Sequence, residues 1–139
     1  MAVNTYAVLR TNVSVMDIAK LINSNGWAEV KSIDFTSFND MYEIFLYAKH
    51  TEEEKKLPIM QRPPRQYATL VVFENNHCKS DYPNLDVDAV TTFLTGVDET
   101  GFRRDLLTKI AKNYGGWILD ETIDMKNFVD VTTGEKVER

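Results

Sequence analysis

The sequence is poor in the residue types that form disulfides and metal sites. Among 139 residues it has one cysteine, Cys78, and two histidines, His50 and His77. A single cysteine excludes an internal disulfide, and one His-Cys pair without a second pair of ligands is a weak metal signal. The best local trio is His77, Cys78 and Asp81. We therefore expect no metal and no other cofactor.

Motifs that bind phosphate or activate a nucleophile are also missing. None of the six glycines falls in the spacing of a phosphate-binding loop, a dinucleotide fold or a nucleophile elbow. Cys78 with His50 or His77 could supply a nucleophile and a base, but neighbouring side chains in an extended loop usually point apart. We name no catalytic residue, so an enzyme is the weaker alternative, and the roles of these three residues stay open.

The chain lacks both an excess of positive charge and a long apolar run. It has 16 Lys and Arg against 21 Asp and Glu, a net charge of -5. This balance argues against a protein whose main task is to bind nucleic-acid phosphates. No segment approaches the roughly 20 apolar residues of a membrane span, and the start lacks the features of a signal peptide. We expect a cytoplasmic protein.

Acidic residues gather in two places instead. They are Asp81, Asp86 and Asp88, and then Asp120, Glu121, Asp124 and Asp130. The simpler interpretation is a solvated surface that keeps the protein in solution. The alternative is a surface that imitates nucleic acid or docks on a basic partner.

The residue pattern predicts a single α+β domain over residues 1–139. The expected elements are a strand at 6–10, a helix between Ser14 and Asn25, a hairpin of strands 27–38 and 41–48, a strand at 67–74, a short helix at 87–94, a long helix at 102–114, a strand at 117–120, a last strand or hairpin within 123–131 and a frayed tail at 132–139. Such an order favours a two-layer sandwich, in which helices cover one face of a mainly antiparallel sheet. A ferredoxin-like arrangement is the nearest familiar fold.

The long helix is the clearest element. Phe102, Leu106, Ile110 and Tyr114 recur every four residues, as on the apolar face of a surface helix. Thr100 can cap its start, and Gly115 is expected at the left-handed position that ends it. The following glycine and apolar residues then predict a strand, on whose sheet the helix packs.

Two further features of the sequence are candidate binding sites. The strand YATLVVFE, residues 67–74, faintly resembles the aromatic strand of RNA-recognition sheets, but lacks the leading basic residue and glycine. We therefore expect Tyr67 and Phe73 in the core. Arg103 and Arg104 could contact an anionic partner, although basic residues at a helix start are usually only tolerated there.

The segment 50–66 is unlike the rest of the chain. It has three prolines within seven positions and the charged run TEEEKK. A loop of this length is uncommon in a compact domain unless it is functional or mobile, and prolines hold it extended. We predict that Ile59 and Met60 are apolar anchors for a partner and that Arg62 and Arg65 form a charged rim. The alternative is that Ile59 and Met60 fold back onto the core.

The C-terminal piece IAKNYGGWILDETIDMKNF, residues 110–128, resembles part of small uncharacterised proteins encoded by bacteriophages. The resemblance brings no known activity or catalytic residue. It implies an accessory phage protein in the host cytoplasm that binds a host or virion protein. Together with the proline-rich loop, it predicts a non-catalytic protein-binding module, for example an inhibitor of a host defence component. The alternatives are a self-assembling structural or virion protein, which would be a homo-oligomer, and a small enzyme or nucleic-acid binder.

Overall fold

The computed structural model describes residues 3–35, 40–96 and 100–139. In chain order its elements are β1 (Asn4–Leu9), α1 (Val15–Ser24), β2 (Glu29–Asp34), β3 (Met41–Tyr47), α2 (Glu52–Lys55), η1 (Ile59–Gln61), β4 (Tyr67–Asn76), η2 (Cys78–Ser80), β5 (Val90–Gly96), α3 (Phe102–Tyr114), β6 (Gly116–Asp120), β7 (Asn127–Asp130) and β8 (Lys136–Glu138). The turn expected at Ser37 and Asn39 and the link at 97–99 lie outside the described residues. Within the described part, no helix is long and apolar enough to span a bilayer.

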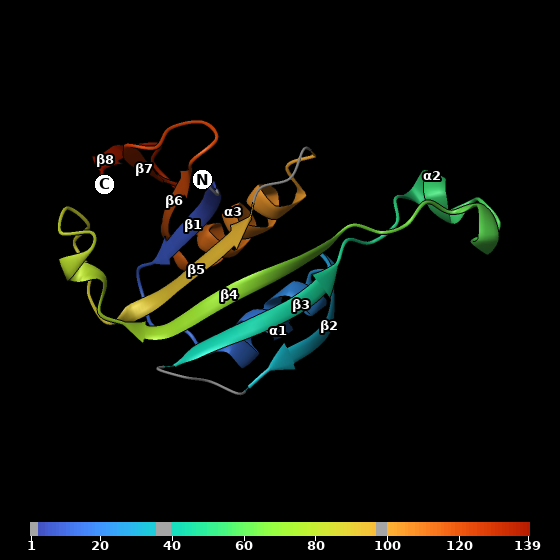
Figure 1. The fold of residues 1–139 in the computed structure, drawn as a ribbon, viewed down its shortest axis with the longest axis horizontal. Helices are drawn as coiled ribbons and strands as arrows, with labels where there is room; N and C mark the ends of the chain where they lie inside the picture. Colours follow the sequence, from blue (N-terminus) through green and yellow to red (C-terminus); the bar gives the residue numbers. More distant parts are fainter. Residues whose placement is uncertain (1–2, 36–39, 97–99) are drawn as a thin grey trace.

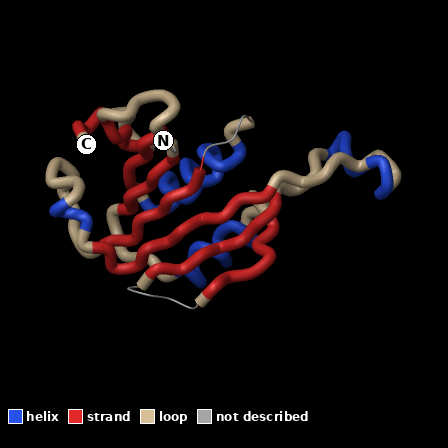
Figure 2. The backbone as a smooth tube through the Cα atoms, in the orientation of Figure 1, coloured by secondary structure: helices blue, strands red, loops and turns tan. Residues whose placement is uncertain are grey.

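All eight strands form one antiparallel sheet, in the order β2-β3-β4-β5-β1-β6-β7-β8. α1 and α3 lie behind this sheet on one face, as Figures 1 and 2 show. The predicted α+β class and antiparallel sheet are therefore confirmed. The ferredoxin-like arrangement is not shown, because β5 separates β4 from β1 and two further strands follow β6.

α1 forms where the sequence predicts it. The Ser14 hydroxyl accepts a hydrogen bond from the N–H of Asp17 at 3.2 Å, which satisfies one of the free donors at the helix start. Its apolar stripe, including Ile18 and Ile22, is buried against the sheet. The helix ends at Asn25, and Gly26 follows at φ 65°.

The predicted hairpin is β2 paired with β3. β3 lies between β2 and β4, as its apolar composition on both faces predicts. The register of β2 shifts between Val30 and Ser32, which marks a β-bulge. β2 is one edge of the sheet, and the three-residue strand β8 is the other.

The long helix and its glycine stop are confirmed. α3 ends at Gly115, which has φ 80°, and packs on β1 and β6. A Cβ on the next residue, Gly116, would lie 2.3 Å from the carbonyl oxygen of Val8, so only glycine lets β6 approach β1 here. At the other end the cap is Gly101, although the Thr100 hydroxyl accepts from the N–H of Phe102 at 3.4 Å.

The short helix expected at 87–94 is wrong. Val90–Gly96 is β5, an interior strand that pairs with β4 on one side and β1 on the other. The helix was expected because Asp86 could cap its start and Gly96 could end it. Thr91 and Thr92 are β-branched, which favours a strand. Pairing with β4 and β1 occupies both edges of β5, and most of its residues are buried.

The frayed tail expected at 132–139 is also wrong. Lys136–Glu138 pairs with β7 as β8, closing a hairpin whose turn has Gly134 at φ 77°. The carboxylate of Asp130 stabilises this turn by accepting hydrogen bonds from the N–H groups of Thr132 and Thr133 at 2.8 and 3.1 Å. The last residue is fixed as well, because the Arg139 guanidinium contacts Glu121 and lies over the ring of Tyr6.

The two faces of the sheet are covered differently. α1 and α3 cover the main core, which includes Ile44, Leu70 and Phe93. On the opposite face, the loop at 77–89 covers only the part around β1, β6 and β7, where Trp117 and Phe128 are buried. Over β3 and β4 no helix lies on that second face in the described part of the chain (Figure 1).

Candidate functional site

Residues 50–66 form an arm that projects from the end of β3 and β4. Figures 1 and 2 show it apart from the sheet and from both packed helices. The hydrogen bond from the N–H of Ala48 to the carbonyl of Gln66, at 2.8 Å, is the last rung of the strand pair before the arm begins. Every described residue from Thr51 to Gln66 is exposed or half-buried. The arm therefore contributes little to the core.

The arm has its own internal structure. Thr51 and Glu54 form a capping box at the start of α2, in which each side chain accepts a hydrogen bond from the other's backbone. The Arg62 guanidinium donates to the carbonyls of Leu57 and Lys55 at 3.1 and 3.0 Å, which ties η1 to the end of α2. The arm is thus a folded projection. The capping signal, T-x-x-E in TEEE, is present in the sequence and was missed.

Arg65 anchors the base of the arm to the sheet. Its guanidinium forms a short ion pair with Glu29 on β2 and lies 5.1 Å from the ring centroid of Tyr47 on β3. The hydrogen bond from Arg65, together with its charge, lowers the pKa of the Glu29 carboxyl. These contacts fix the direction in which the arm leaves the body.

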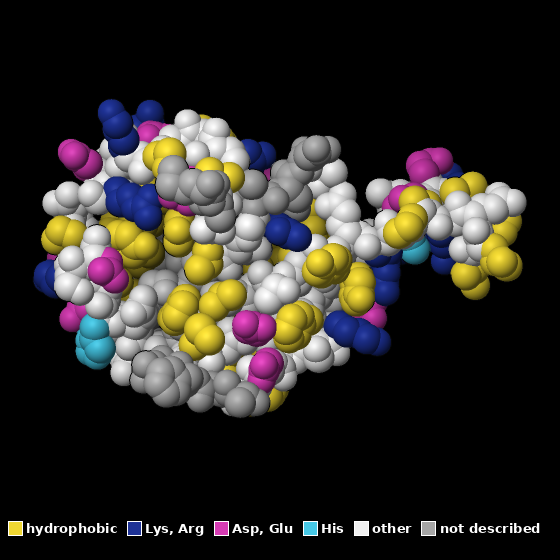
Figure 3. Space-filling view, viewed as in Figure 1, with side chains coloured by type: hydrophobic (Ala, Val, Ile, Leu, Met, Phe, Trp, Pro, Cys, Tyr) yellow, Lys and Arg dark blue, Asp and Glu magenta, His cyan; other side chains and the backbone are white. Residues whose placement is uncertain are grey.

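Two apolar side chains stand at the tip of the arm. Ile59 is 78% exposed and Met60 is 97% exposed, and Leu57 beside them is 40% exposed. Hydrophobic side chains are visible at the far end of the projection in Figure 3. The alternative that Ile59 and Met60 fold back onto the core is therefore wrong. Arg62 and Arg65, expected as a charged rim, make intrachain contacts that shape the arm.

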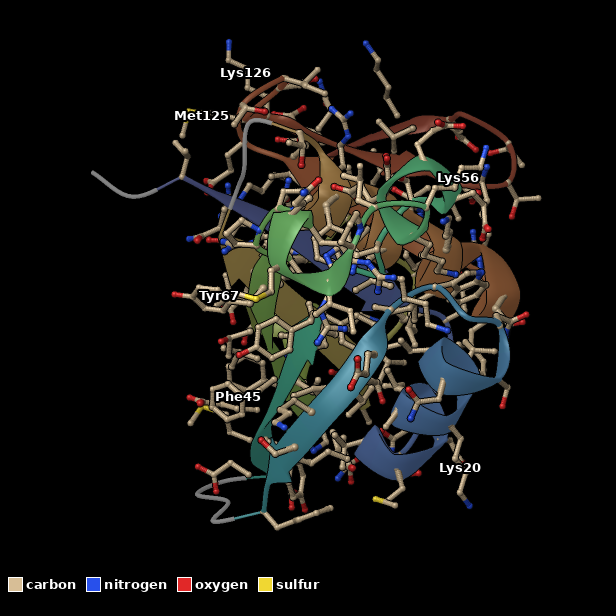
Figure 4. All side chains as sticks on the ribbon, turned by 90° about the vertical axis from the view of Figure 1, so that its right-hand side faces the viewer. Lys20, Phe45, Lys56, Tyr67, Met125 and Lys126 are labelled. Atoms are coloured by element: carbon tan, nitrogen blue, oxygen red, sulfur yellow. The ribbon has the colours of Figure 1, made fainter. Side chains whose placement is uncertain are left out.

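An apolar surface adjoins the base of the arm on the uncovered side of β3 and β4; we call it the open face. Its larger side chains are Phe45, Tyr47, Tyr67, Val71 and Phe73, which alternate with buried residues along the two strands. Figure 4 shows Phe45 and Tyr67 on the side away from α1, which carries Lys20. Tyr67 is 63% exposed, so its expected place in the core is wrong.

The acidic residues near the C-terminus are mostly paired within the chain. The ion pairs are Asp120 with Arg104 at 3.5 Å, Glu121 with Arg139 at 3.0 Å and Asp130 with Arg10 at 2.5 Å. Burial would raise the pKa of Asp130, but the N–H groups of Thr132 and Thr133 and the Arg10 guanidinium hold it below its ordinary value. These carboxylates stabilise the fold rather than presenting free negative charge. Arg104, weighed above as an anion contact, is part of this pairing.

The histidines and the cysteine do not meet in one site. His50 lies at the base of the arm, where its Nε2 is 3.0 Å from the carbonyl oxygen of Pro63. His77 and Cys78 follow the opposite end of β4: the His77 ring is exposed 3.5 Å from Asp88, while the Cys78 thiol is buried. Burial raises the pKa of that thiol. Among the described residues, no group of three potential metal ligands comes together.

Comparison with protein-family models, with curated protein sequences and with solved structures finds no match to this chain. The tip of the arm and the open face both have apolar side chains that the fold leaves exposed or half-buried. The arm leaves the end of β3 and β4 where Tyr47 and Tyr67 of the open face lie, so one partner could contact both surfaces.

Proposed function

We propose that the chain is a non-catalytic protein-binding module whose arm carries the partner contact, with Ile59 and Met60 as apolar anchors. The observation that carries this proposal is their exposure on a projection that is internally folded. A folded arm loses little conformational entropy when it docks, which favours binding. The resemblance to phage accessory proteins suggests a host or virion protein as partner, for example a host defence component.

Burial of the tip alone would give a weak complex. Complete burial of two such side chains contributes roughly 3–6 kcal/mol before the costs of association are subtracted. A micromolar complex requires about 8 kcal/mol of net binding free energy. The partner must therefore contact more than Ile59 and Met60. The open face, joined to the base of the arm through Arg65 and Tyr47, is the adjacent apolar surface that could supply this additional area.

A protein partner fits this region better than a nucleic acid does. The exposed ring of Tyr67 could stack on a base, as aromatic residues do on RNA-binding sheets. However, Glu43 and Asp34 project from the same side of β3 and β2, and Arg65 is already paired with Glu29. Figure 3 shows acidic side chains among the hydrophobic ones on this face. Such a surface would repel phosphates.

Self-assembly is the second candidate. The chain carries both an apolar tip and an apolar open face, so the arm of one copy could dock on the open face of another. Contacts of this head-to-tail kind produce rings or filaments. Sedimentation of the purified protein at micromolar concentration distinguishes the two candidates, because a monomer indicates a different partner and a defined oligomer indicates self-assembly.

The decisive experiment compares two matched double variants. Ile59→Ser with Met60→Ser changes the tip of the arm. Ile123→Ser with Met125→Ser changes the same residue types in the turn before β7, where they are 70% and 46% exposed. The two sites lie at opposite ends of the molecule (Figure 1). Capture from a host lysate, quantified protein by protein, and sedimentation are measured for both variants and the unchanged protein.

We expect the arm variant to lose a captured protein, or to dissociate an oligomer, by roughly tenfold or more, since truncating an interface hot spot costs about 2 kcal/mol. The control variant should behave like the unchanged protein. If both variants bind normally, the arm is not the interface. If only the variant with Ile123→Ser and Met125→Ser loses binding, the interface lies in the C-terminal segment between Asp120 and Asp130.

A further inference from the structure

A cavity of about 370 Å³ lies where the helix layer of the fold ends. α3 is its wall on one side, and β6, β7 and the turns before and after β7 line the rest. β7 extends the sheet beyond α3, so Val129 and Val131 face a space that no described helix fills. With Ile118 they form an apolar floor, and Ile123 lies at the rim. The size is in the range of sites for small ligands.

Most of the polar groups that line the cavity already have an ion-pair or hydrogen-bond partner within the protein. Asp120 is paired with Arg104, and Asp130 with Arg10. The two carboxylate oxygens of Asp124 accept hydrogen bonds from the N–H of Lys126 at 2.8 Å and the side-chain amide of Asn127 at 3.0 Å. Lys112 is exposed and, among the described residues, forms no ion pair.

The two ends of the cavity carry different groups. Arg104, Thr108 and Lys112 are spaced every four residues and so follow one side of α3. Because Trp117 at the start of β6 pairs with Asp130 at the end of β7, Lys112 and Val131 share one end. Ile123 and Asp124 lie at the other. A cation therefore stands at one end of an apolar floor.

We propose that this cavity binds a small carboxylate with an unbranched apolar body, whose carboxylate contacts the Lys112 ammonium and whose body lies on Ile118, Val129 and Val131. This site is separate from the arm and does not depend on the function proposed for it. The carboxylate complements the lysine, and the apolar body covers the half-buried Val129 and Val131 beside the buried Ile118.

Octanoate is a suitable probe, with 1-octanol and octylammonium as probes of the same chain length and different charge. Binding is followed by amide chemical shifts in NMR titrations of the full chain. We expect octanoate to bind with a Kd of about 1 mM or tighter, and to shift resonances of Thr108, Lys112, Val129 and Val131. Both other probes should bind more weakly.

Lys112→Met keeps the aliphatic stem and removes the charge, and should weaken octanoate about fivefold, as expected for a partly exposed ion pair. It should leave 1-octanol unchanged. Lys109→Met is the matched control, because Lys109 is an exposed lysine on the same helix but does not line the cavity. Its octanoate affinity should not change.

Three results would overturn the proposal. The first is that octanoate fails to bind at millimolar concentration or shifts resonances elsewhere. The second is that octylammonium binds more tightly than octanoate, which would make the acidic end of the cavity dominant. The third is that Lys109→Met and Lys112→Met weaken octanoate equally, which would indicate a general charge effect.

Discussion

The arm and the C-terminal hairpin of β7 and β8 both lie at the limits of the sheet, and they are held in opposite ways. The hairpin is short, yet Phe128 is buried beneath the ring of Tyr82, with centroids 5.0 Å apart, and Asp130 is paired with Arg10. The arm is longer and well ordered by its own hydrogen bonds, yet it buries none of its side chains completely.

Local order and attachment to the core are therefore separate properties of this protein. Arg62 and the capping box order the arm without tying it to the sheet. Phe128 and Asp130 tie the hairpin to the sheet through contacts with residues distant in sequence. Mutations in the hairpin should therefore change the free energy of unfolding, whereas mutations in the arm should change only binding and local opening.

The largest effect is expected for Phe128→Ala. Removing a fully buried phenylalanine should lower the free energy of unfolding by about 3–5 kcal/mol, because apolar burial is lost and a cavity remains. Urea denaturation monitored by circular dichroism measures the change. Met60→Ala in the arm is the control and should change it by less than about 0.5 kcal/mol. Equal losses in the two variants would refute the distinction between the regions.

Asp130→Asn should have the next largest effect. It weakens a charge-assisted hydrogen bond to Arg10 and two to backbone N–H groups, so we expect a loss of about 1.5–3 kcal/mol at neutral pH. Asp86→Asn, at an exposed carboxyl, is the control. It should change the free energy of unfolding by no more than about 0.5 kcal/mol.

The effect of Asp130→Asn should also depend on pH. The pKa of Asp130 in the folded protein lies below its ordinary value of 3.8, so folding favours the ionised form. This stabilisation is complete above the unfolded-state pKa and is lost as the pH falls through the lower folded-state pKa. The difference between the unchanged protein and the variant should therefore shrink between about pH 5 and pH 2. A difference that stays constant would show that the carboxylate charge is unimportant.

Gly115→Val tests how the chain enters the C-terminal strands. Because Gly115 has φ 80°, a residue with a Cβ should be strained there by about 1–2 kcal/mol. Thermal unfolding gives the shift in melting temperature. Gly134→Ala, at φ 77° with no atom within 4 Å of the added Cβ, measures the backbone strain without a steric contact. An unchanged melting temperature for Gly115→Val would contradict the observed helix end.

The smallest effect on stability is expected for Arg62→Ala in the arm. The change removes the hydrogen bonds to Lys55 and Leu57, but the free energy of unfolding should change by less than about 0.5 kcal/mol. Limited proteolysis should instead cut the arm several times faster, because local opening becomes easier. Protection equal to that of the unchanged protein would mean that Arg62 does not order the arm.

Local signals made much of the fold predictable. The Ser14 cap, the four-residue stripe of α3 and the stop at Gly115 depend on neighbours in sequence, and each was found where predicted. β5 was missed because its identity depends on pairing with β4 and β1, which sequence periodicity does not encode. The β7–β8 hairpin did have a local signal, the turn glycine Gly134. The segment was nevertheless predicted to be a frayed tail.

The candidate sites were predictable only in part. Proline content predicted an unusual loop, and the exposure of Ile59 and Met60 agrees with the role proposed for them. The open face was not predicted, because whether Tyr67 points to a helix or to solvent depends on which side of the sheet the helices cover. The cavity beside α3 was not predicted either, because it also depends on which part of the sheet the helices cover. It exists because β7 extends past the last helix.

The bulge in β2 and the shortness of β8 also bear on how this protein behaves at high concentration. An edge strand exposes unpaired backbone groups that can template fibrils by pairing with another molecule. Here one edge is interrupted between Val30 and Ser32 and carries the exposed Lys31, while the other is only three residues long. Both features discourage backbone pairing between molecules. Amyloid-like growth from the native state should therefore be slow, even though a sheet of eight strands presents two open ends.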